Sequence, residues 1–186
     1  MRIIAGQYRS RRLKPPPPGA ELRPTSDRLR ETLFNVLAKR IEGATFADLF
    51  AGTGGVGIEA LSRGAAKVYF AESDRKAARL IRENLQAMKI GEEAERMESD
   101  AADAIRSLEA EGITCDIVFL DPPYTAHGAY ARVLERLAES NTIGSNSIVI
   151  AEHDKHFDPG AEFGRLIRFR KLCQGDAVLS FYRMSG

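Results

Sequence analysis

The sequence contains few cysteines and no long apolar run. Its 186 residues include two cysteines, Cys115 and Cys173, which are too few for a disulfide scaffold or a set of zinc fingers. No apolar stretch approaches the roughly 18–20 residues that a membrane-spanning helix needs. Arg2 and Arg9 bracket a polar N-terminal stretch, where a secretory signal would carry an apolar segment. We therefore expect a cytoplasmic protein that binds no metal and contacts no membrane.

The chain as a whole has no excess of either charge. Lys and Arg number 27 against 26 Asp and Glu, and the net charge of +1 excludes a uniformly basic nucleic-acid binder. The distribution is uneven, however, because residues 1–14 contain no acid and the remainder holds 22 basic and 26 acidic groups. A cationic arm on a mildly acidic body indicates a polyanionic partner at the N-terminal end. The basic groups of the arm are Arg2, Arg9, Arg11, Arg12 and Lys14.

A run of prolines divides the chain. Residues 2–14 predict a β-hairpin around Gly6, and Pro15–Pro18 with Gly19 predict an extended linker, because proline has no N–H to donate to a sheet. We expect a basic hairpin and Pro-rich linker at residues 1–19 and one larger domain at residues 20–186. The length suits a single domain with such an appendage, and we expect a monomer.

From residue 44 onward, short apolar runs alternate with amphipathic stretches. The runs predict strands, the amphipathic stretches predict helices, and their alternation predicts a mostly parallel sheet covered on both faces, a Rossmann-like α/β fold. Two further strand-like runs, 163–171 and 176–183, have no helix between them, so the last strand should be antiparallel. The expected strands are 45–50, 67–71, 94–98, 115–120 and 147–151, and the expected helices are 26–40, 55–63, 74–89, 101–111 and 128–139.

A glycine-rich loop follows the first of these strands. Gly52, Gly54 and Gly57 match the spacing G-x-G-x-x-G between a strand and a helix, where a backbone without Cβ atoms lets a ligand approach the helix N-terminus. Glu72 ends the next strand, at the position where an acid accepts hydrogen bonds from ribose hydroxyls. These features predict an adenosine-containing cofactor. The alternative is a tight turn followed by a solvated glutamate.

Asp48 bears on the choice between a dinucleotide and another adenosine cofactor. It precedes the first glycine by four residues, where a carboxylate would repel a pyrophosphate and suit a cationic ligand group. A helix and a linker also precede the first strand, whereas dinucleotide folds usually open with that strand. Both features count against a nicotinamide dehydrogenase.

The strand at residues 115–120 runs into Asp121, Pro122, Pro123 and Tyr124. The two prolines stop the strand and leave carbonyl acceptors at its carboxyl end. A carboxylate, a carbonyl and an aromatic ring within four residues suit a planar base with an exocyclic amine, on which Tyr124 would stack. The alternative is a loop that only terminates the strand.

The corner and the stretch DLFAGTG at residues 48–54 resemble the amino-methyltransferases that use S-adenosylmethionine. Four further stretches are similar to the RsmD family of bacterial small-subunit (16S) rRNA guanine-N2 methyltransferases. The resemblance covers nearly the whole chain and implies a seven-stranded class I methyltransferase fold, S-adenosylmethionine as cofactor, and a guanine N2 amine as acceptor in the small ribosomal subunit or its assembly intermediate. The stretches are RIIAG at 2–6, RPTSDR at 23–28, RETLFN at 30–35 and GIEALSRGA at 57–65.

The resemblance also implies roles for individual residues. Asp121 and the Pro122 carbonyl would hold the amine, with Pro123 and Tyr124 completing the catalytic corner. Asp100 would accept from the adenine amine, and Thr25 would contact the cofactor, although either could instead cap a helix. The implied cofactor-binding residues are Thr25, Asp48, Phe50, Gly52, Gly54, Gly57, Glu72, Asp100 and Ala101.

The five basic groups of the arm would contact RNA phosphates beside the pocket, and Arg165, Arg168 and Arg170 are weaker candidates for the same role. The alternatives are a solubilising tail and a solvated strand face. Two other functions remain open from the sequence. One is an amino-methyltransferase that acts on adenine N6 or on DNA, and the other is a catalytically silent RNA-binding assembly factor.

Overall fold

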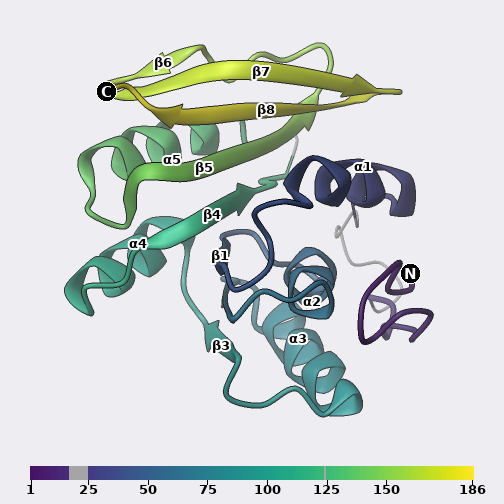
Figure 1. The fold of residues 1–186 in the computed structure, drawn as a ribbon. Helices are drawn as coiled ribbons and strands as arrows, with labels where there is room; N and C mark the ends of the chain where they lie inside the picture. Colours follow the sequence, from purple (N-terminus) through teal and green to yellow (C-terminus); the bar gives the residue numbers. More distant parts are fainter. Residues whose placement is uncertain (17–24, 124) are drawn as a thin grey trace.

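A single twisted sheet organises the described residues, 1–16, 25–123 and 125–186, of the computed structural model (Figure 1). The strands are β1 (Thr45–Asp48), β2 (Lys67–Ala71), β3 (Ala94–Met97), β4 (Cys115–Leu120), β5 (Ile143–Asp154), β6 (Glu162–Phe163), β7 (Leu166–Gln174) and β8 (Ala177–Met184). They lie in the order β3-β2-β1-β4-β5-β8-β7-β6. The first five of these are parallel, β8 is antiparallel to β5, and β7 is antiparallel to β8.

This architecture confirms the expected mostly parallel, Rossmann-like sheet with an antiparallel last strand. The sheet has eight strands rather than seven, because the two-residue β6 pairs with the start of β7. The main departure in the strand boundaries is β5, which begins earlier and ends later than expected.

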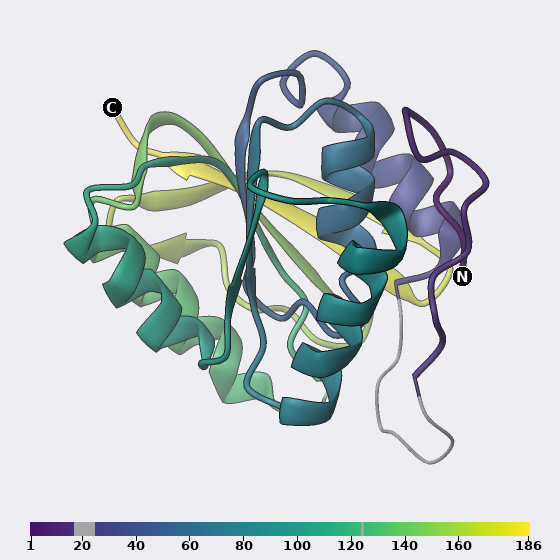
Figure 2. The same ribbon diagram turned by 90° about the horizontal axis from the view of Figure 1, so that it is seen from below.

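Helices cover both faces of the sheet, as parallel crossovers require. Figure 2 shows α1, α2 and α3 on one side and α4 and α5 on the other. The residues 117–120 of β4 are all apolar because both faces of the strand are covered. Ile117 and Phe119 pack in the α1–α3 layer, and Val118 and Leu120 pack in the α4–α5 layer. The helices are α1 (Asp27–Leu37), α2 (Gly55–Ser62), α3 (Arg75–Met88), α4 (Ala101–Ala110) and α5 (His127–Glu139).

The N-terminal arm folds back on itself and lies against α2. The expected hairpin is a narrow loop with one isolated bridge, between Arg2 and Arg12, rather than two regular strands. Ile3 and Leu13 are buried in the same core as α1 and α2. A Cβ added at Gly6 would lie 1.7 Å from the Ser62 carbonyl oxygen, so the arm approaches the end of α2 backbone to backbone. The end of the proline linker, from residue 17, lies outside the described residues.

A buried ion pair ties the arm to α1 and α2. The Arg30 side chain is fully buried, and its guanidinium donates to the Arg2 carbonyl at 2.5 Å and to the Asp27 carboxylate at 3.0 Å. It also lies 3.5 Å from the buried Glu59 carboxylate. Glu59 in turn accepts from the backbone N–H groups of Ile4, at 2.8 Å, and its neighbour in the arm. The buried Arg30–Glu59 pair therefore connects the arm, α1 and α2.

We expect Arg30→Ala to lower the free energy of unfolding by about 3 kcal/mol. The substitution opens a cavity and removes one cationic partner of Glu59, while Arg63 still contacts that carboxylate at 2.8 Å. Urea denaturation measures the change. Arg28→Ala removes an exposed arginine from the same helix and should cost no more than about 0.5 kcal/mol. Equal effects of the two substitutions would contradict the role given to the buried pair.

Candidate active site

Three acidic side chains share one face of the sheet at its carboxyl edge. Asp48 ends β1, Asp121 follows β4, and Glu152 lies near the end of β5. Each comes two residues after a side chain that packs in the α1–α3 layer, and alternate residues of a strand face the same side. The register pairs Asp48 with Phe119 and Leu120 with Ala151, which brings the three strand ends level. The parallel sheet thus gathers carboxylates that are far apart in sequence.

Thr25 connects two of these carboxylates to the start of α1. Its side chain is buried, and its hydroxyl lies 3.0 Å from Glu152 Oε2 and 3.5 Å from Asp121 Oδ2. Helix α1 is capped by Ser26, which accepts from the Leu29 N–H, so capping does not occupy Thr25. The structure therefore brings Thr25 to the predicted catalytic corner. Glu152 was not among the residues predicted from the sequence, although an acid directly after the apolar run 147–151 is a usable signal.

Glycine is required for different structural reasons at the three positions of the loop. Gly52 and Gly54 adopt left-handed backbone conformations, with φ of 53° and 79°, which side chains disfavour. Gly54 is also the N-cap of α2. A Cβ at Gly57 would lie 2.2 Å from the ring of Phe70 on β2, so this glycine lets the helix approach the sheet. Its N–H donates to Asp48 Oδ2 at 3.0 Å.

Asp48 is a buried carboxylate with an altered proton affinity. Burial raises the pKa of its carboxyl group to about 7, the Gly57 N–H opposes this shift, and the nearby Glu72 carboxylate adds to it. A cationic group placed beside Asp48 would stabilise the ionised form. The site therefore suits a ligand with an ammonium group better than one with a phosphate.

Glu72 holds the glycine loop in place. Its Oε2 accepts from the Gly52 N–H and its Oε1 from the Asp74 N–H, both at 2.8 Å. Each carboxylate oxygen has a second lone pair, so these bonds leave capacity for two ligand hydroxyls. Phe50 lies between Asp48 and Gly52 in the sequence. Its side chain is half-buried and packs against the α4–α5 core.

The end of β3 carries the remaining expected cofactor residues. Asp100 caps α4 by accepting from the Asp103 N–H at 2.8 Å, so the capping alternative holds for one of its oxygens. Ala101 is buried beside it. Within the described part of the chain, the buried hydroxyl of Ser99, next to Asp100, has no hydrogen-bond partner, and no motif in the sequence indicates this.

The predicted catalytic corner lies where β4 ends. Asp121 is half-buried, Pro122 is buried, and the exposed Pro123 accepts from the Ala126 N–H at 2.7 Å. Tyr124 lies outside the described residues. The following segment is held against the loop after β5, because the His127 ring stacks on Phe157 with centroids 4.1 Å apart. No spacing in the sequence indicates this stack.

The basic groups of the arm are all exposed, but they do not gather at the carboxyl edge. Arg2 and Arg12 line a hollow of about 380 Å³ beside Asp27, near the start of α1. The side chain of Arg11 points towards α3 instead, where it donates to the Met88 carbonyl. Lys14 pairs with Glu83 of α3 at 3.1 Å. The arm therefore presents charge along α2 and α3, and only part of it lies near the site.

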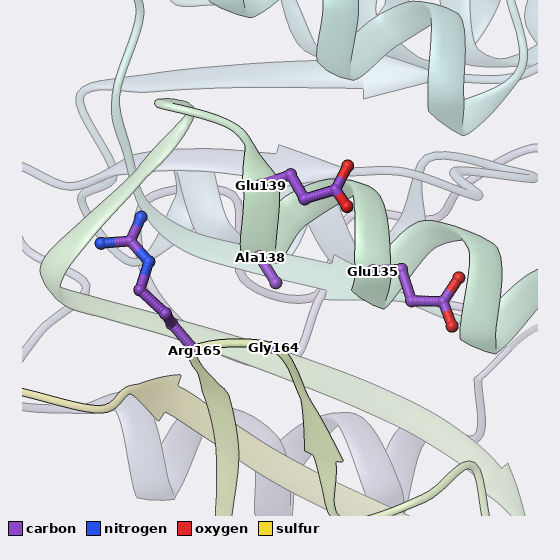
Figure 3. Close-up of a pocket in the computed structure, with 5 residues that line it drawn as sticks. All are labelled: Glu135, Ala138, Glu139, Gly164 and Arg165. Carbon is purple, nitrogen blue, oxygen red and sulfur yellow. The ribbon is translucent and has the colours of Figure 1, made fainter.

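Another hollow, of about 400 Å³, lies between α5 and the β6–β7 turn (Figure 3). Glu135, Glu139 and Arg165 surround it, and it contains none of the predicted catalytic or cofactor-binding residues, although Arg165 was a candidate RNA contact. Among the described residues, no group of three or more His, Cys, Asp or Glu side chains could hold a metal ion. In the same residues, no helix is long and apolar enough to cross a membrane.

Comparison with known proteins gives consistent relatives. A family model described as conserved hypothetical protein 95 matches residues 1–183. Ribosomal RNA small subunit methyltransferase D of Haemophilus influenzae is 40% identical and covers 83% of this chain and 79% of its own. A Bacillus subtilis protein named as an rRNA methyltransferase, YlbH, is 33% identical over the full length of both chains. Among solved structures, one named as a methyltransferase, yhhF of Escherichia coli, is 32% identical with a TM-score of 0.85 and covers 100% of this chain and 98% of that chain.

A more distant solved structure shows the fold alone. It is named as a methyltransferase complexed with SAH, is 14% identical, and has a TM-score of 0.66. The match covers 83% of this chain and 49% of that chain.

We expect Gly57→Ala to destabilise the protein by about 1–3 kcal/mol, because the added methyl group forces α2 away from Phe70. Thermal or urea unfolding measures the loss. Gly91→Ala is the matched control, since a Cβ there meets nothing closer than 3.7 Å, and it should change stability by no more than about 0.5 kcal/mol. A tolerated alanine at position 57 would show that the close approach of helix and strand is not required.

Proposed function

The chain belongs to the conserved hypothetical protein 95 (RsmD) family, and from this membership we propose that it transfers a methyl group from S-adenosylmethionine to the exocyclic N2 amine of a guanine in small-subunit ribosomal RNA. The observation that carries the proposal is the meeting of the glycine loop, Asp48 and Asp121 at one edge and on one face of the sheet. The names of the relatives support a methyltransferase of small-subunit rRNA. The guanine N2 specificity is the finer part of the proposal.

The residues around the glycine loop fit the methyl donor. Ionised Asp48 would hold the α-ammonium group, and the Gly52–Gly57 backbone would hold the methionine portion. Glu72 would accept from the ribose hydroxyls, and Asp100, Ala101 and Ser99 would line the adenine end. Bound S-adenosylmethionine supplies an electrophilic methyl group on a sulfonium centre. The SAH in the name of a distant methyltransferase of the same fold agrees with this donor.

Asp121 would act on the acceptor amine. The lone pair of guanine N2 is delocalised into the ring, so the nitrogen becomes nucleophilic only as it turns pyramidal and gains positive charge. The Asp121 carboxylate and the Pro122 carbonyl would favour that charged form, an electrostatic effect concentrated in the transition state. The Thr25 hydroxyl has one hydrogen, and it lies closer to Glu152, at 3.0 Å, than to Asp121, at 3.5 Å, so Thr25 would orient Asp121 only when that hydrogen turns from Glu152 to Asp121. Asp121 or water would then receive the proton.

The experiment that tests the function follows the methyl group to its product. Labelled S-adenosylmethionine is incubated with the protein and, separately, with small ribosomal subunits, naked small-subunit RNA and DNA, and the labelled nucleoside is identified. We expect N2-methylguanosine from the subunit or its RNA. N6-methyladenine, or label in DNA, would replace the guanine assignment. Absence of transfer to every substrate would favour a catalytically silent RNA-binding factor.

We expect Asp121→Ala to lower kcat by about 100-fold or more while S-adenosylmethionine still binds, because the carboxylate acts mainly on the developing charge of the amine. Single-turnover methyl transfer and calorimetric titration measure the two quantities. Asp116→Ala, at the exposed start of the same strand, should leave kcat within about twofold, as expected for a surface change away from the site. Near-normal turnover by Asp121→Ala would exclude the assigned role.

The affinity for S-adenosylmethionine should depend on pH through Asp48. The free carboxyl group has a pKa of about 7, and the ammonium group of the donor stays protonated below about pH 8. Because the ionised carboxylate binds the cation, affinity should fall as pH drops below 7, by up to about tenfold per pH unit. Titration between pH 5.5 and 7.5 measures this slope. Asp48→Asn should bind weakly with a flat profile, and an unchanged slope in that variant would contradict the assignment.

The exposed arm arginines would contribute phosphate contacts. Replacing Arg2, Arg9 and Arg12 with glutamine preserves the buried Ile3 and Leu13. It should reduce the slope of log affinity for small-subunit RNA against log salt by about 1 for each phosphate that the variant no longer binds. Binding of S-adenosylmethionine should be unchanged. If the variant shows the same salt slope as the unsubstituted protein, the arm arginines do not contact RNA phosphates.

A further inference from the structure

The far edge of the sheet carries an apolar and basic surface that the proposed catalytic site does not use. Ile167 and Phe169 are 37% and 45% exposed, and they are the exposed large hydrophobic side chains of the described residues. Phe169 lies between Arg168 and Arg170 on β7, and Arg183 lies opposite Ile167 on β8. We refer to Ile167, Phe169, Arg170 and Arg183 as the β7–β8 patch. In Figure 1 this hairpin forms the edge of the sheet beyond β5.

A bulge explains why an aromatic ring is exposed there. Arg168 pairs with Tyr182 and Arg170 pairs with Phe181, which leaves Phe169 as the extra residue of β7. A bulge interrupts the ladder and redirects a side chain. The centroids of the Phe169 and Phe181 rings lie 6.3 Å apart, and the Arg183 guanidinium lies 5.3 Å from the centroid of the Phe169 ring. The ring is thus fixed at the surface by one aromatic and one cationic neighbour.

The arginines of the patch differ from the other cations of the hairpin. Arg168 and Lys171 both pair with Asp158. In the described part of the chain, Arg170 and Arg183 form no ion pair, and Arg170 lies 5.8 Å over the Phe181 ring instead. The strand pairing also places Glu162 opposite Ile167. Arg183 on β8 and Glu162 on β6 thus flank Ile167, so the patch is cationic around Phe169 and carries one acid beside its Ile167 end.

An exposed aromatic ring with unneutralised arginines matches the chemistry of single-stranded RNA. Bases stack on aromatic rings and on guanidinium planes, while arginines bind the adjacent phosphates. We propose that the β7–β8 patch binds a single-stranded RNA segment beside the target guanine, with one base stacked on the Phe169–Arg183 pair and a phosphate held by Arg170. The link to a target guanine rests on the function proposed above. Two exposed apolar side chains form a small area for a protein partner. The positive charge around them complements the phosphates of RNA, and it therefore favours RNA as the partner.

The patch lies within reach of the catalytic corner. Arg170 is opposite Phe181, and Phe181 is opposite Ile150, two residues before Glu152. Counted to Asp121, which lies on the next strand, two residues along a strand and three strand spacings across the sheet amount to about 16 Å. Phe181 and Ile150 belong to the α1–α3 layer and are fully buried, so the patch is on the same face as Asp121 but the direct path between them is covered. An RNA strand that contacts both places therefore passes over this layer.

The test compares matched single substitutions for their binding to a mixed-sequence single-stranded RNA and to the small-subunit RNA. We expect Phe169→Ala to weaken both affinities by about 10-fold, a typical loss of one stacked base, and Phe169→Trp to keep them. Arg170→Gln should lower the salt slope by about 1. Glu162→Gln should tighten binding. Arg132→Gln is the control, because this exposed arginine lies on α5, which covers the opposite face of the sheet and carries no proposed RNA contact.

Each outcome decides the proposal. Unchanged RNA affinity in Phe169→Ala, or an equal loss in Arg132→Gln, overturns it. If Phe169→Ala weakens binding only to particles that contain ribosomal proteins, the patch contacts protein and the RNA assignment is wrong. Methyl transfer by the unsubstituted protein is measured separately. A protein that binds RNA through Phe169 but transfers no methyl group keeps the patch and loses the proposed function.

Discussion

The pleat of the three parallel strands β1, β4 and β5 determines which face of the sheet the acidic side chains at their carboxyl ends occupy. Alternate residues face opposite layers, so a carboxylate two positions beyond a buried apolar side chain faces the same layer as that side chain. Asp48, Asp121 and Glu152 all follow this rule at one sheet edge. A shift of one residue in any of these strands would turn its acid towards α4 and α5. The glycine loop and Thr25 matter because they lie against that edge.

The helix layer over this edge is held by the buried Arg30–Glu59 pair. Arg30 is on α1 and Glu59 is on α2, and both also bind the backbone of the N-terminal arm. The arm is therefore more than a basic tail, since its apolar residues complete the core that positions α1. Thr25, directly before that helix, contacts Asp121 and Glu152. Helix α1 thus connects the buried Arg30–Glu59 pair with the proposed catalytic corner, which Thr25 contacts just before the helix begins.

Local patterns in the sequence were sufficient to place the helices and the central strands, but they wrongly predicted a regular N-terminal hairpin. The strand at Cys115–Leu120 was predicted to the residue, because a short apolar run that ends at two prolines permits few alternatives. The contacts that join distant segments could not be predicted. Thr25 and Glu152 are 127 residues apart, and only the fold brings them together. The exposed Phe169 depends on a bulge, which a period-two pattern does not reveal. The extra strand β6 is two residues long and leaves almost no pattern to detect.

The central claim is that one edge of the sheet holds the methyl donor beside Asp121. A crystal structure of the protein with S-adenosylhomocysteine bound tests it most directly. The account predicts the amino-acid end of the ligand against Asp48 and the Gly52–Gly57 loop, the ribose at Glu72, and the sulfur facing Asp121 and Thr25. A ligand bound in the hollow beside Arg165, or a sulfur turned away from Asp121, would contradict it.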